Sequence, residues 1–301
     1  MRRWMPVSRL GVILLTAVTL VAFAANSLLC RMALAPRLID PVAFTVIRLA
    51  SGVAILVPLS MFLGEPRQQR RPQGSWRSGA ALFVYAMAFS LAYVSLETGM
   101  GALILFGSVQ LTMIGVGLWQ GERPKLQEWL GLAVAMAGLV YLVWPGISAP
   151  DPLGASLMIA SGAAWGVYSL RGKQSRDPVA ATAGNFARTL PFGAIALLLS
   201  WPSLQAAPRG LVLAVVSGAL TSGLGYVIWY LALRGLTATR AAIVQLAVPL
   251  IAAAGGIVFL AEDATARLAI ASVLILGGVA GAAVAKSSPR DIEPCEKRRL
   301  R

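Results

Sequence analysis

The chain contains no histidine and only two cysteines in 301 residues. Histidine is the commonest proton shuttle and metal ligand of proteins, so both of these uses are excluded. Cys30 lies in an early apolar segment and Cys295 in a charged segment near the end, a spacing that suggests neither a disulfide framework nor a zinc site. We therefore expect no metal and no cofactor.

Acidic residues are scarce as well. The 12 Asp and Glu residues all fall in predicted loops, tails or segment ends. A membrane-embedded hydrolase would need a Ser/His arrangement, paired Asp residues or metal ligands inside the membrane. The phosphate-binding pattern G-x-x-x-x-G-K-[ST] of many ATPases is also missing. The sequence therefore indicates a protein that is not an enzyme.

Apolar residues are abundant instead, at 57% of the chain against 13% charged residues. Soluble domains contain about 45–50% apolar and about 25% charged residues. A helix crosses the hydrocarbon core of a membrane with roughly 20 residues, and ten such segments fill the chain. They are Leu10–Leu29, Val42–Leu63, Trp76–Leu96, Gly99–Trp119, Gln127–Trp144, Leu153–Leu170, Val179–Trp201, Gly210–Leu233, Ala238–Leu260 and Ala266–Ala285. We predict an all-α integral membrane protein with ten transmembrane helices.

The net charge of +14 comes from Lys and Arg residues whose distribution along the chain is typical of membrane proteins. With the N-terminus inside, the cytoplasmic loops and tails hold 20 of the 26 Lys and Arg residues and the outer loops hold four. The other two, Arg48 and Arg188, fall within spans. We expect a protein of the bacterial inner (plasma) membrane with both termini in the cytoplasm. We expect it to contact the lipid bilayer and to bind no nucleic acid.

The sequence also contains an internal repeat. The tetrapeptide DPVA at Asp40–Ala43 recurs at Asp177–Ala180, at an offset of 137 residues. AFAAN at Ala22–Asn26 aligns with AWGVY at Ala164–Tyr168, at an offset of 142. A third match keeps the same Gly-Glu-Gly spacing at an offset of 140: Gly115, Glu122 and Gly138, then Gly255, Glu262 and Gly278. We predict two homologous halves of five spans each.

Because five is an odd number, the second half enters the membrane from the opposite side. This inverted repeat is a common architecture of secondary transporters, whose site lies between the halves near the midplane. We place the first half at 10–147, the second at 148–285 and a basic cytoplasmic tail at 286–301. The two DPVA copies are interpreted as helix starts, with Asp as the N-cap and Pro at the first helical position.

Four segments carry a resemblance to a known family. They are DPVAFTVIR (Asp40–Arg48), GERPKLQEWLGLAVAMAGLVYLV (Gly121–Val143), GYVIWYLALRG (Gly225–Gly235) and AVPLIAAAGGIVFLAE (Ala247–Glu262). Over residues 10–285 the chain resembles the EamA-type transporters of the drug/metabolite transporter superfamily. The resemblance implies ten helices in two inverted halves, with a central cavity enclosed mainly by helices 1–4 and 6–9. Members of the family export amino acids, among them aromatic ones, and other metabolites.

Two arginines within spans are candidate substrate ligands. Arg48 lies about 10 Å inside the second span, at 1.5 Å per residue, and a charge at that depth is functional by default. It either binds a carboxylate or another anion, or it is a structural arginine that bonds helix carbonyls or extends outward. Arg188 and Asn185 share one face of the seventh span. They either bind a polar group of the substrate or bridge two helices.

Aromatic residues recur at helical spacing in three spans. Trp165 and Tyr168 are three residues apart, and Tyr85 and Phe89 are four apart, as are Tyr226 and Tyr230. Such stripes either stack flat or cationic substrates or pack against neighbouring helices and lipid. Three uncharged amides inside spans either line the cavity or bridge helices. They are Asn26, Gln110 and Gln245.

These features together favour a secondary transporter. We expect it to export amino acids, aromatic ones included, or similar small amphipathic metabolites by alternating access, as a monomer, with a dimer as the alternative. The rival activities are those of a lipid-linked sugar flippase, which needs a lateral opening between helices, and of a drug efflux protein. Proton-coupled drug efflux relies on a carboxylate inside the membrane, which this sequence lacks.

Overall fold

The structure is a computed structural model that describes residues 8–63, 73–121, 125–143, 150–173, 175, 177–201 and 204–284. The predicted basic tail, 286–301, lies outside these residues. Within them every regular element is a helix. The elements are α1 (Arg9–Leu34), α2 (Pro41–Leu63), α3 (Trp76–Ala92), α4 (Thr98–Trp119), α5 (Leu126–Val143), α6 (Pro152–Lys173), α7 (Pro178–Ala187), α8 (Leu190–Ser200), α9 (Pro208–Val216), the π-helix η3 (Ser217–Leu224), α10 (Gly225–Leu233), α11 (Ala238–Gln245), α12 (Val248–Leu260) and α13 (Ala266–Val284).

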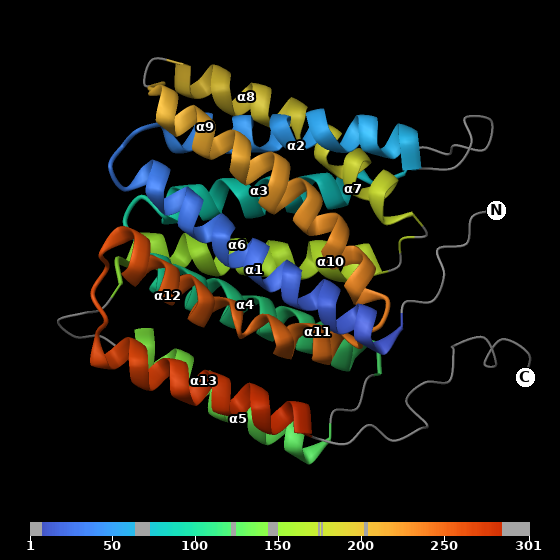
Figure 1. Cartoon of the computed structure of the whole chain (residues 1–301), viewed down its shortest axis with the longest axis vertical. Helices are drawn as coiled ribbons and strands as arrows, with labels where there is room; N and C mark the ends of the chain where they lie inside the picture. Colours follow the sequence, from blue (N-terminus) through green and yellow to red (C-terminus); the bar gives the residue numbers. More distant parts are fainter. Residues whose placement is uncertain are drawn as a thin grey trace, which may run out of the picture.

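The helices lie side by side as one bundle with roughly aligned axes (Figure 1). Six segments are long and apolar enough to cross a membrane: Arg9–Leu34, Pro41–Phe62, Thr98–Trp119, Pro152–Lys173, Pro208–Leu233 and Arg240–Leu260. The remaining helices are shorter or form parts of a broken span. The all-helical class predicted from the sequence is therefore confirmed.

Two predicted spans of the second half are interrupted rather than continuous. The seventh is divided into α7 and α8 just before Pro191, and the ninth into α11 and α12 just before Pro249. Proline lacks the N–H that a helix interior needs and disfavours helical backbone at the preceding residue, so both breaks have a local cause. Gly255 and Gly256, in contrast, lie inside the unbroken α12.

Both DPVA copies start helices in the predicted way. The Asp40 carboxylate accepts hydrogen bonds from the backbone N–H groups of Val42 (2.8 Å) and Ala43 (3.2 Å) at the start of α2. The Asp177 carboxylate accepts one from the N–H of Ala180 at 3.0 Å, at the start of α7. Each carboxylate satisfies N–H groups that the first turn of a helix leaves without partners.

Helices α5 and α13 form a pair at one edge of the bundle (Figure 1). A Cβ on Gly138 of α5 would lie 3.1 Å from the carbonyl oxygen of Ala271, and a Cβ on Gly278 of α13 would overlap that of Gly131. Gly138 and Gly278 are repeat mates, as are Gly131 and Ala271. The contact is thus reciprocal, and the two helices run antiparallel because the early part of one packs on the late part of the other.

The interior of the bundle combines helices from both halves. Helix α6 packs against α3 and α4, while α1 packs against α10 and α12. Helix α2 packs against the π-helix η3 and α7. Elements of residues 8–121 are therefore interleaved with elements of residues 150–260, and the side chains at the centre come from both.

Candidate functional site

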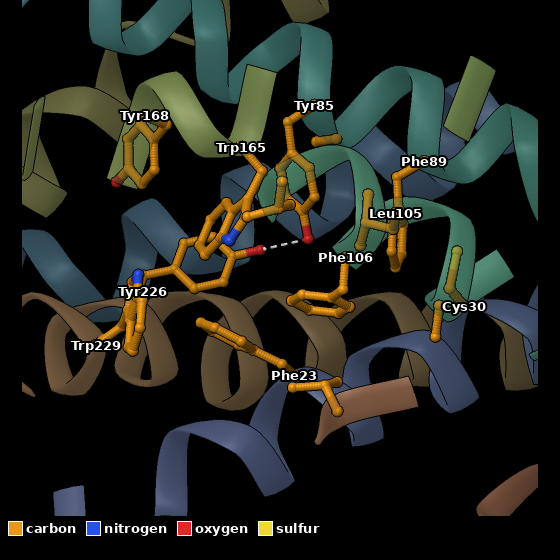
Figure 2. Packing of buried hydrophobic residues seen from close by; sticks show 14 of the residues in the cluster. Phe23, Cys30, Tyr85, Phe89, Leu105, Phe106, Trp165, Tyr168, Tyr226 and Trp229 are labelled. Carbon is orange, nitrogen blue, oxygen red and sulfur yellow. Dashed lines mark hydrogen bonds between the residues drawn. The ribbon is translucent and has the colours of Figure 1, made fainter. Parts of the chain in front are cut away.

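A cluster of aromatic rings fills the centre of the bundle (Figure 2). Trp165 of α6 lies at its middle, with ring centroids 4.6 Å from Tyr226 of α10, 4.9 Å from Tyr85 of α3 and 5.2 Å from Phe23 of α1. The Phe23 ring also stacks on Phe106 of α4 at 6.3 Å. Trp165, Tyr85, Tyr226, Phe23 and Phe106 are all buried. Five helices therefore converge on one aromatic site.

Arg48 of α2 places a buried guanidinium beside these rings, with 1% of its surface exposed. Its Nε donates a hydrogen bond to Ser222 Oγ at 2.8 Å, and its Nη2 donates to the hydroxyls of Tyr226 at 2.6 Å and Tyr85 at 3.1 Å. The guanidinium carbon also lies 5.3 Å from the centroid of the Tyr85 ring and 5.1 Å from that of Phe89. None of the described residues that Arg48 hydrogen-bonds carries a negative charge.

Close packing of α2 against the π-helix positions this arginine. A Cβ on Gly218 of η3 would overlap the carbonyl oxygen of Arg48 and the hydroxyl of Ser51, so only glycine allows this approach. π-Helical turns inside helices are rare and are frequently found at functional sites. In this case the η3 segment brings Ser222 within hydrogen-bonding distance of the guanidinium.

A second polar side chain, Asn26 of α1, joins the same network. Its Oδ1 accepts hydrogen bonds from Ser217 at 2.7 Å, Thr221 at 3.2 Å and Ser222 at 3.4 Å, all on η3. Its Nδ2 lies 3.5 Å from the Tyr85 hydroxyl, which it donates to. Asn26 and Arg48 are thereby connected through shared partners.

Gln245 of α11 forms a hydrogen bond with the aromatic cluster. Its Oε1 accepts a hydrogen bond from the indole Nε1 of Trp165 at 3.0 Å. Its Nε2 donates to the Ala241 carbonyl at 2.9 Å and to the Met113 sulfur at 3.4 Å. The amide is fully satisfied and fixes the orientation of the Trp165 ring.

The space left between the rings is small. A cavity of about 10 Å³ is lined by Phe23, Ser27, Tyr85, Phe89, Leu105, Phe106 and Trp165. That volume is close to what one water molecule requires. Ligand sites in proteins are typically several hundred Å³ in volume. A metabolite therefore enters this site only after the rings have moved apart.

Several polar side-chain atoms inside the bundle are buried without a hydrogen-bond partner among the described residues, and one of them belongs to Ser27, which lines the cavity. They are Ser27 Oγ, Arg48 Nη1, the Tyr168 hydroxyl and both amide atoms of Gln110. Buried polar groups in native proteins are nearly always paired, because leaving one unpaired costs about 1–3 kcal/mol. The site therefore retains unused hydrogen-bonding capacity next to the aromatic rings.

Hydrogen bonds close the bundle at the end where α1 and α12 terminate. Arg31 Nε lies 3.5 Å from Glu262 Oε1, and its Nη1 donates to the carbonyl oxygens of Tyr93 and Val94 at 3.1 Å each. Glu262 in turn accepts from the Thr98 N–H at 3.0 Å and from its hydroxyl at 2.8 Å. We call Arg31, Glu262 and Thr98 the outer latch, because the distribution of Lys and Arg predicts that this end faces outside.

A larger pocket of about 360 Å³ lies next to the outer latch. Its lining residues are Arg31, Met32, Ala35, Pro36, Leu38, Arg209, Phe259, Leu260 and Glu262. None of them lines the central cavity. This pocket therefore does not open into the aromatic site in the observed conformation.

The opposite end of the bundle is closed by different contacts. Ser75 donates its N–H to Asn185 Oδ1 at 3.0 Å, and Arg188 Nη1 donates to the Gln73 carbonyl at 3.0 Å. The Arg171 Nε donates to Ser78 Oγ at 2.9 Å. These bonds join the start of α3 to α6 and α7. The central site is therefore shut off from both ends at once.

The structure brings together eight of the side chains that the sequence proposed as substrate ligands. They are Asn26, Arg48, Tyr85, Phe89, Trp165, Tyr168, Tyr226 and Gln245, all of them buried. Gln110 is buried as well, one helical turn after Phe106 on α4, and does not line the cavity. The other two, Asn185 and Arg188, contact the backbone of residues 73 and 75 instead. Their observed role matches the alternative of a bridge between helices. Arg48 neither bonds helix carbonyls with its side chain nor extends outward, since its partners are hydroxyl groups.

Sequence reasoning missed four participants. Phe23 and Phe106 line the cavity, and Trp229 lies 5.7 Å from Phe23. Ser222 was not among the candidate ligands, yet its hydroxyl accepts a hydrogen bond from Arg48. The repeat alignment offered a signal for Phe23, because its mate in the second half is Trp165.

Comparisons with known proteins agree with this architecture. The profile of the EamA-like transporter family matches residues 10–144 and, a second time, residues 152–284. An uncharacterized protein of Pseudomonas aeruginosa is 50% identical over 268 residues, which cover 89% of this chain and 93% of that protein. A crystal structure of a protein that is 23% identical has the same fold, with a TM-score of 0.69, and covers 90% of this chain and 99% of its own.

More distant relatives have named activities. The threonine/homoserine exporter RhtA of Salmonella typhimurium is 29% identical over 257 residues, covering 79% of this chain and 80% of RhtA. RhtA of Escherichia coli K12 is 28% identical over 231 residues, covering 73% and 74%. The two family matches together span nearly all of the chain. This membrane protein therefore belongs to the EamA-like transporter family, a family of transporters and not of enzymes.

Proposed function

We propose that the chain is a secondary exporter of amino acids, or of similar small amphipathic metabolites, that works by alternating access. The substrate site is the aromatic cluster around Trp165 together with Arg48. The exporter activity of the RhtA relatives supports this direction of transport. The substrate class rests on the chemistry of the site itself.

The observation that carries the proposal is the buried charge of Arg48. A charged side chain near the centre of a membrane costs about 2.5–3.5 kcal/mol on insertion scales. Hydroxyl partners offset part of this cost but leave the charge itself uncompensated. The carboxylate of a bound amino acid supplies the missing negative charge, and Arg48 Nη1, which has no partner, is free to donate to it. Arginine is well suited to such recognition because of its planar set of donors.

The other end of an amino acid is also accommodated. The faces of Trp165, Tyr226 and Phe23 surround the centre, and aromatic faces attract an ammonium group. The same faces would stack on an aromatic side chain, so aromatic amino acids are included in the proposed class. A zwitterion thus finds a cation for its carboxylate and rings for its ammonium group.

The closure of both ends supports alternating access. The outer latch closes one end and the bonds of Asn185, Arg188 and Arg171 close the other, with almost no free volume between them. Transport then requires one set of bonds to break while the other stays formed. The breaks at Pro191 and Pro249 and the π-helix are the points where these helices bend most readily.

We also infer that the two halves form an inverted repeat of five spans each, with both termini in the cytoplasm of a bacterium and the protein in its inner membrane. The antiparallel, reciprocal packing of α5 and α13 supports this, because corresponding helices of inverted halves run in opposite directions. The site then lies between the halves. We propose that one chain forms a complete transporter, since both halves contribute to the site.

The rival activities find less support. A lipid-linked sugar flippase needs a lateral path from the membrane to its site, and the pocket beside the outer latch shares no lining residue with the central cavity. Proton-coupled drug efflux needs a carboxylate in the membrane, and Arg48 is the only charged side chain among the described residues that are buried. Export of zwitterionic metabolites is therefore the better proposal.

Counterflow in proteoliposomes tests the function. Vesicles with the purified chain are loaded with L-threonine, L-homoserine, L-tryptophan, a nucleoside or a sugar, and uptake of the labelled compound is measured. We expect exchange of at least one amino acid and none of the nucleoside or sugar. L-Threoninamide, which lacks the carboxylate, is added as a competitor and should compete at least tenfold less well than threonine.

Two variants connect the result to Arg48. Arg48→Gln removes the charge and should abolish counterflow, whereas Arg48→Lys keeps the charge and should retain part of it. Folding of each variant is followed by its melting temperature in detergent. Equal competition by threonine and threoninamide in the wild-type protein would refute the role of the carboxylate, whatever the variants do.

A further inference from the structure

Gln110 of α4 is the most incompletely bonded buried side chain near the cavity. It has 1% of its surface exposed, and neither Nε2 nor Oε1 has a hydrogen-bond partner among the described residues. Gln245 is a buried amide of the same type, yet its oxygen and nitrogen are both bonded. Burial alone therefore does not explain why Gln110 lacks partners.

The position of Gln110 on α4 directs it toward the same space. Phe106, four residues earlier, lines the cavity, and Met113, three residues later, accepts the hydrogen bond of Gln245. Residues at these spacings share one face of a helix. Gln110 is thus on the α4 face that also carries Phe106 of the cavity wall and Met113, the partner of Gln245.

Three of the groups that have no hydrogen-bond partner among the described residues differ in their chemistry. Arg48 Nη1 is a charged donor, Ser27 Oγ both donates and accepts, and the Gln110 amide offers two donors and an acceptor. An amino acid can place its carboxylate on Arg48 and its ammonium group near Ser27 and the rings. Its side chain is then the part that remains to contact Gln110. A neutral amide pairs best with a neutral group that donates, accepts or does both.

We propose that Gln110 binds the side chain of the substrate, and that the preferred substrates are small amino acids whose side chains end in a neutral hydrogen-bonding group, a hydroxyl or an amide. This inference rests on the proposed function. Charged side chains are disfavoured because Arg48 is the only charged group among the buried residues described, so a second charge would have no counter-charge. Apolar side chains leave the amide unpaired, which is a cost that a hydroxyl removes.

Pairs of isosteric amino acids test the proposal. Threonine differs from valine, and homoserine from norvaline, by a hydroxyl in place of a methyl group. In counterflow with the wild-type chain, each hydroxyl compound should be preferred over its isostere by about tenfold or more, since sites built for a hydrogen bond discriminate strongly against analogues that lack it. Gln110→Met, which keeps the length without the amide, should abolish the preference while valine and norvaline are still transported.

Ser108→Ala is the matched control. Ser108 lies on the same helix, and its hydroxyl already donates to the Ile104 carbonyl at 2.9 Å, so its removal should leave the preference unchanged. Because Gln110→Met could fail to fold, the wild-type protein is also melted with each amino acid. Threonine and homoserine should raise the melting temperature more than valine and norvaline do.

The outcomes separate this inference from the proposed function. Absence of counterflow with every amino acid contradicts the function itself. Equal transport of both members of each pair leaves the function standing and overturns the role of Gln110. A Gln110→Met variant that slows both members equally assigns the amide a packing role, for which an internal water would be the partner, and likewise overturns the proposal.

Discussion

Phe23 and Trp165, which occupy corresponding positions in the two halves, touch each other edge to face, with ring centroids 5.2 Å apart and planes at 90°. Equivalent residues of a two-fold arrangement meet only close to its axis. In the proposed inverted repeat, the centre of the aromatic cluster is therefore where the two halves face each other. The pair is not identical, because only Trp165 has an indole N–H, which Gln245 accepts.

Trp165→Ala should lower counterflow at least tenfold without preventing folding or membrane insertion. The substitution removes the ring that contacts Tyr85, Tyr226 and Phe23, so the wall of the proposed site is lost. Trp165→Phe keeps a ring but not the hydrogen bond to Gln245 and should have a smaller effect. Unchanged transport of every substrate by Trp165→Ala would assign this ring to packing alone.

The sequence predicted the helical class and the helix starts because both depend on local chemistry. Apolar length sets a span, and the Asp-Pro pairs at Asp40 and Asp177 supply an N-cap and a first helical residue. The burial of Arg48 followed from its depth in α2 in the same way. These features need no knowledge of what packs against them.

The positions of Arg188 and Asn185 could not be predicted by that reasoning. A continuous seventh span would place Arg188 at mid-depth, but α7 ends at Ala187 and Arg188 is its C-cap. Helical side chains point toward the N-terminus of their helix, and Arg188 Nη1 bonds the Gly184 carbonyl and the Gln73 carbonyl in that direction. The break before Pro191 has a local cause that the prediction of a continuous span left out, whereas the contact with residue 73 is a tertiary feature.

The role of Ser222 and the small size of the cavity could not be predicted from the sequence either. Helical periodicity assumes 3.6 residues per turn, whereas the π-helix Ser217–Leu224 changes which residues share a face. The near absence of free volume depends on rings from four helices, α1, α3, α4 and α6, that meet around the cavity. No single segment contains that information.

Weakening the outer latch should favour opening at that end. Glu262→Gln removes the ion pair with Arg31 and one acceptor for Thr98, interactions worth about 1–1.5 kcal/mol together, which corresponds to a roughly 5- to 10-fold larger open population. Cys30, a buried residue next to Arg31, is a native reporter. A membrane-impermeant maleimide added to intact cells should label it faster by that factor.

Asp263→Asn is the control for the outer latch, because this exposed neighbour of Glu262 makes no side-chain bond to Arg31 or Thr98 within the described structure. It should leave the labelling rate of Cys30 unchanged. An equal rate in wild-type and Glu262→Gln protein would show that the outer latch does not hold this end closed.

Cysteine labelling also tests the inverted topology. Gln205, before α9, and Gln120, after α4, are both exposed and lie at opposite ends of the bundle in the ten-span arrangement. In a background with Cys30 and Cys295 replaced by Ala, a cysteine at position 205 should react with an impermeant reagent in intact cells. A cysteine at position 120 should react only after the membrane is permeabilised. The reverse pattern would invert the orientation, and labelling of both from outside would contradict the ten spans.

Transport should not require a proton gradient. A coupled proton needs a titratable group that is reachable from each side in turn, and arginine, the only buried charged residue described, stays protonated at physiological pH. Glu97 is a carboxylate whose pKa is raised. Burial raises it most, the charges of Glu262 and Asp263 also raise it, and the charge of Arg31 lowers it. Glu97 is exposed at the outer latch, so it exchanges protons with that side only.

We therefore expect a facilitator or exchanger. Counterflow in proteoliposomes should proceed at the same rate with and without a pH gradient, and Glu97→Gln should leave both rates unchanged. The alternative is accumulation of substrate driven by an imposed proton gradient and abolished by an uncoupler. If Glu97→Gln also abolished that accumulation, the proton would travel through the outer latch, and Glu97 would have to become accessible from the opposite side during each cycle.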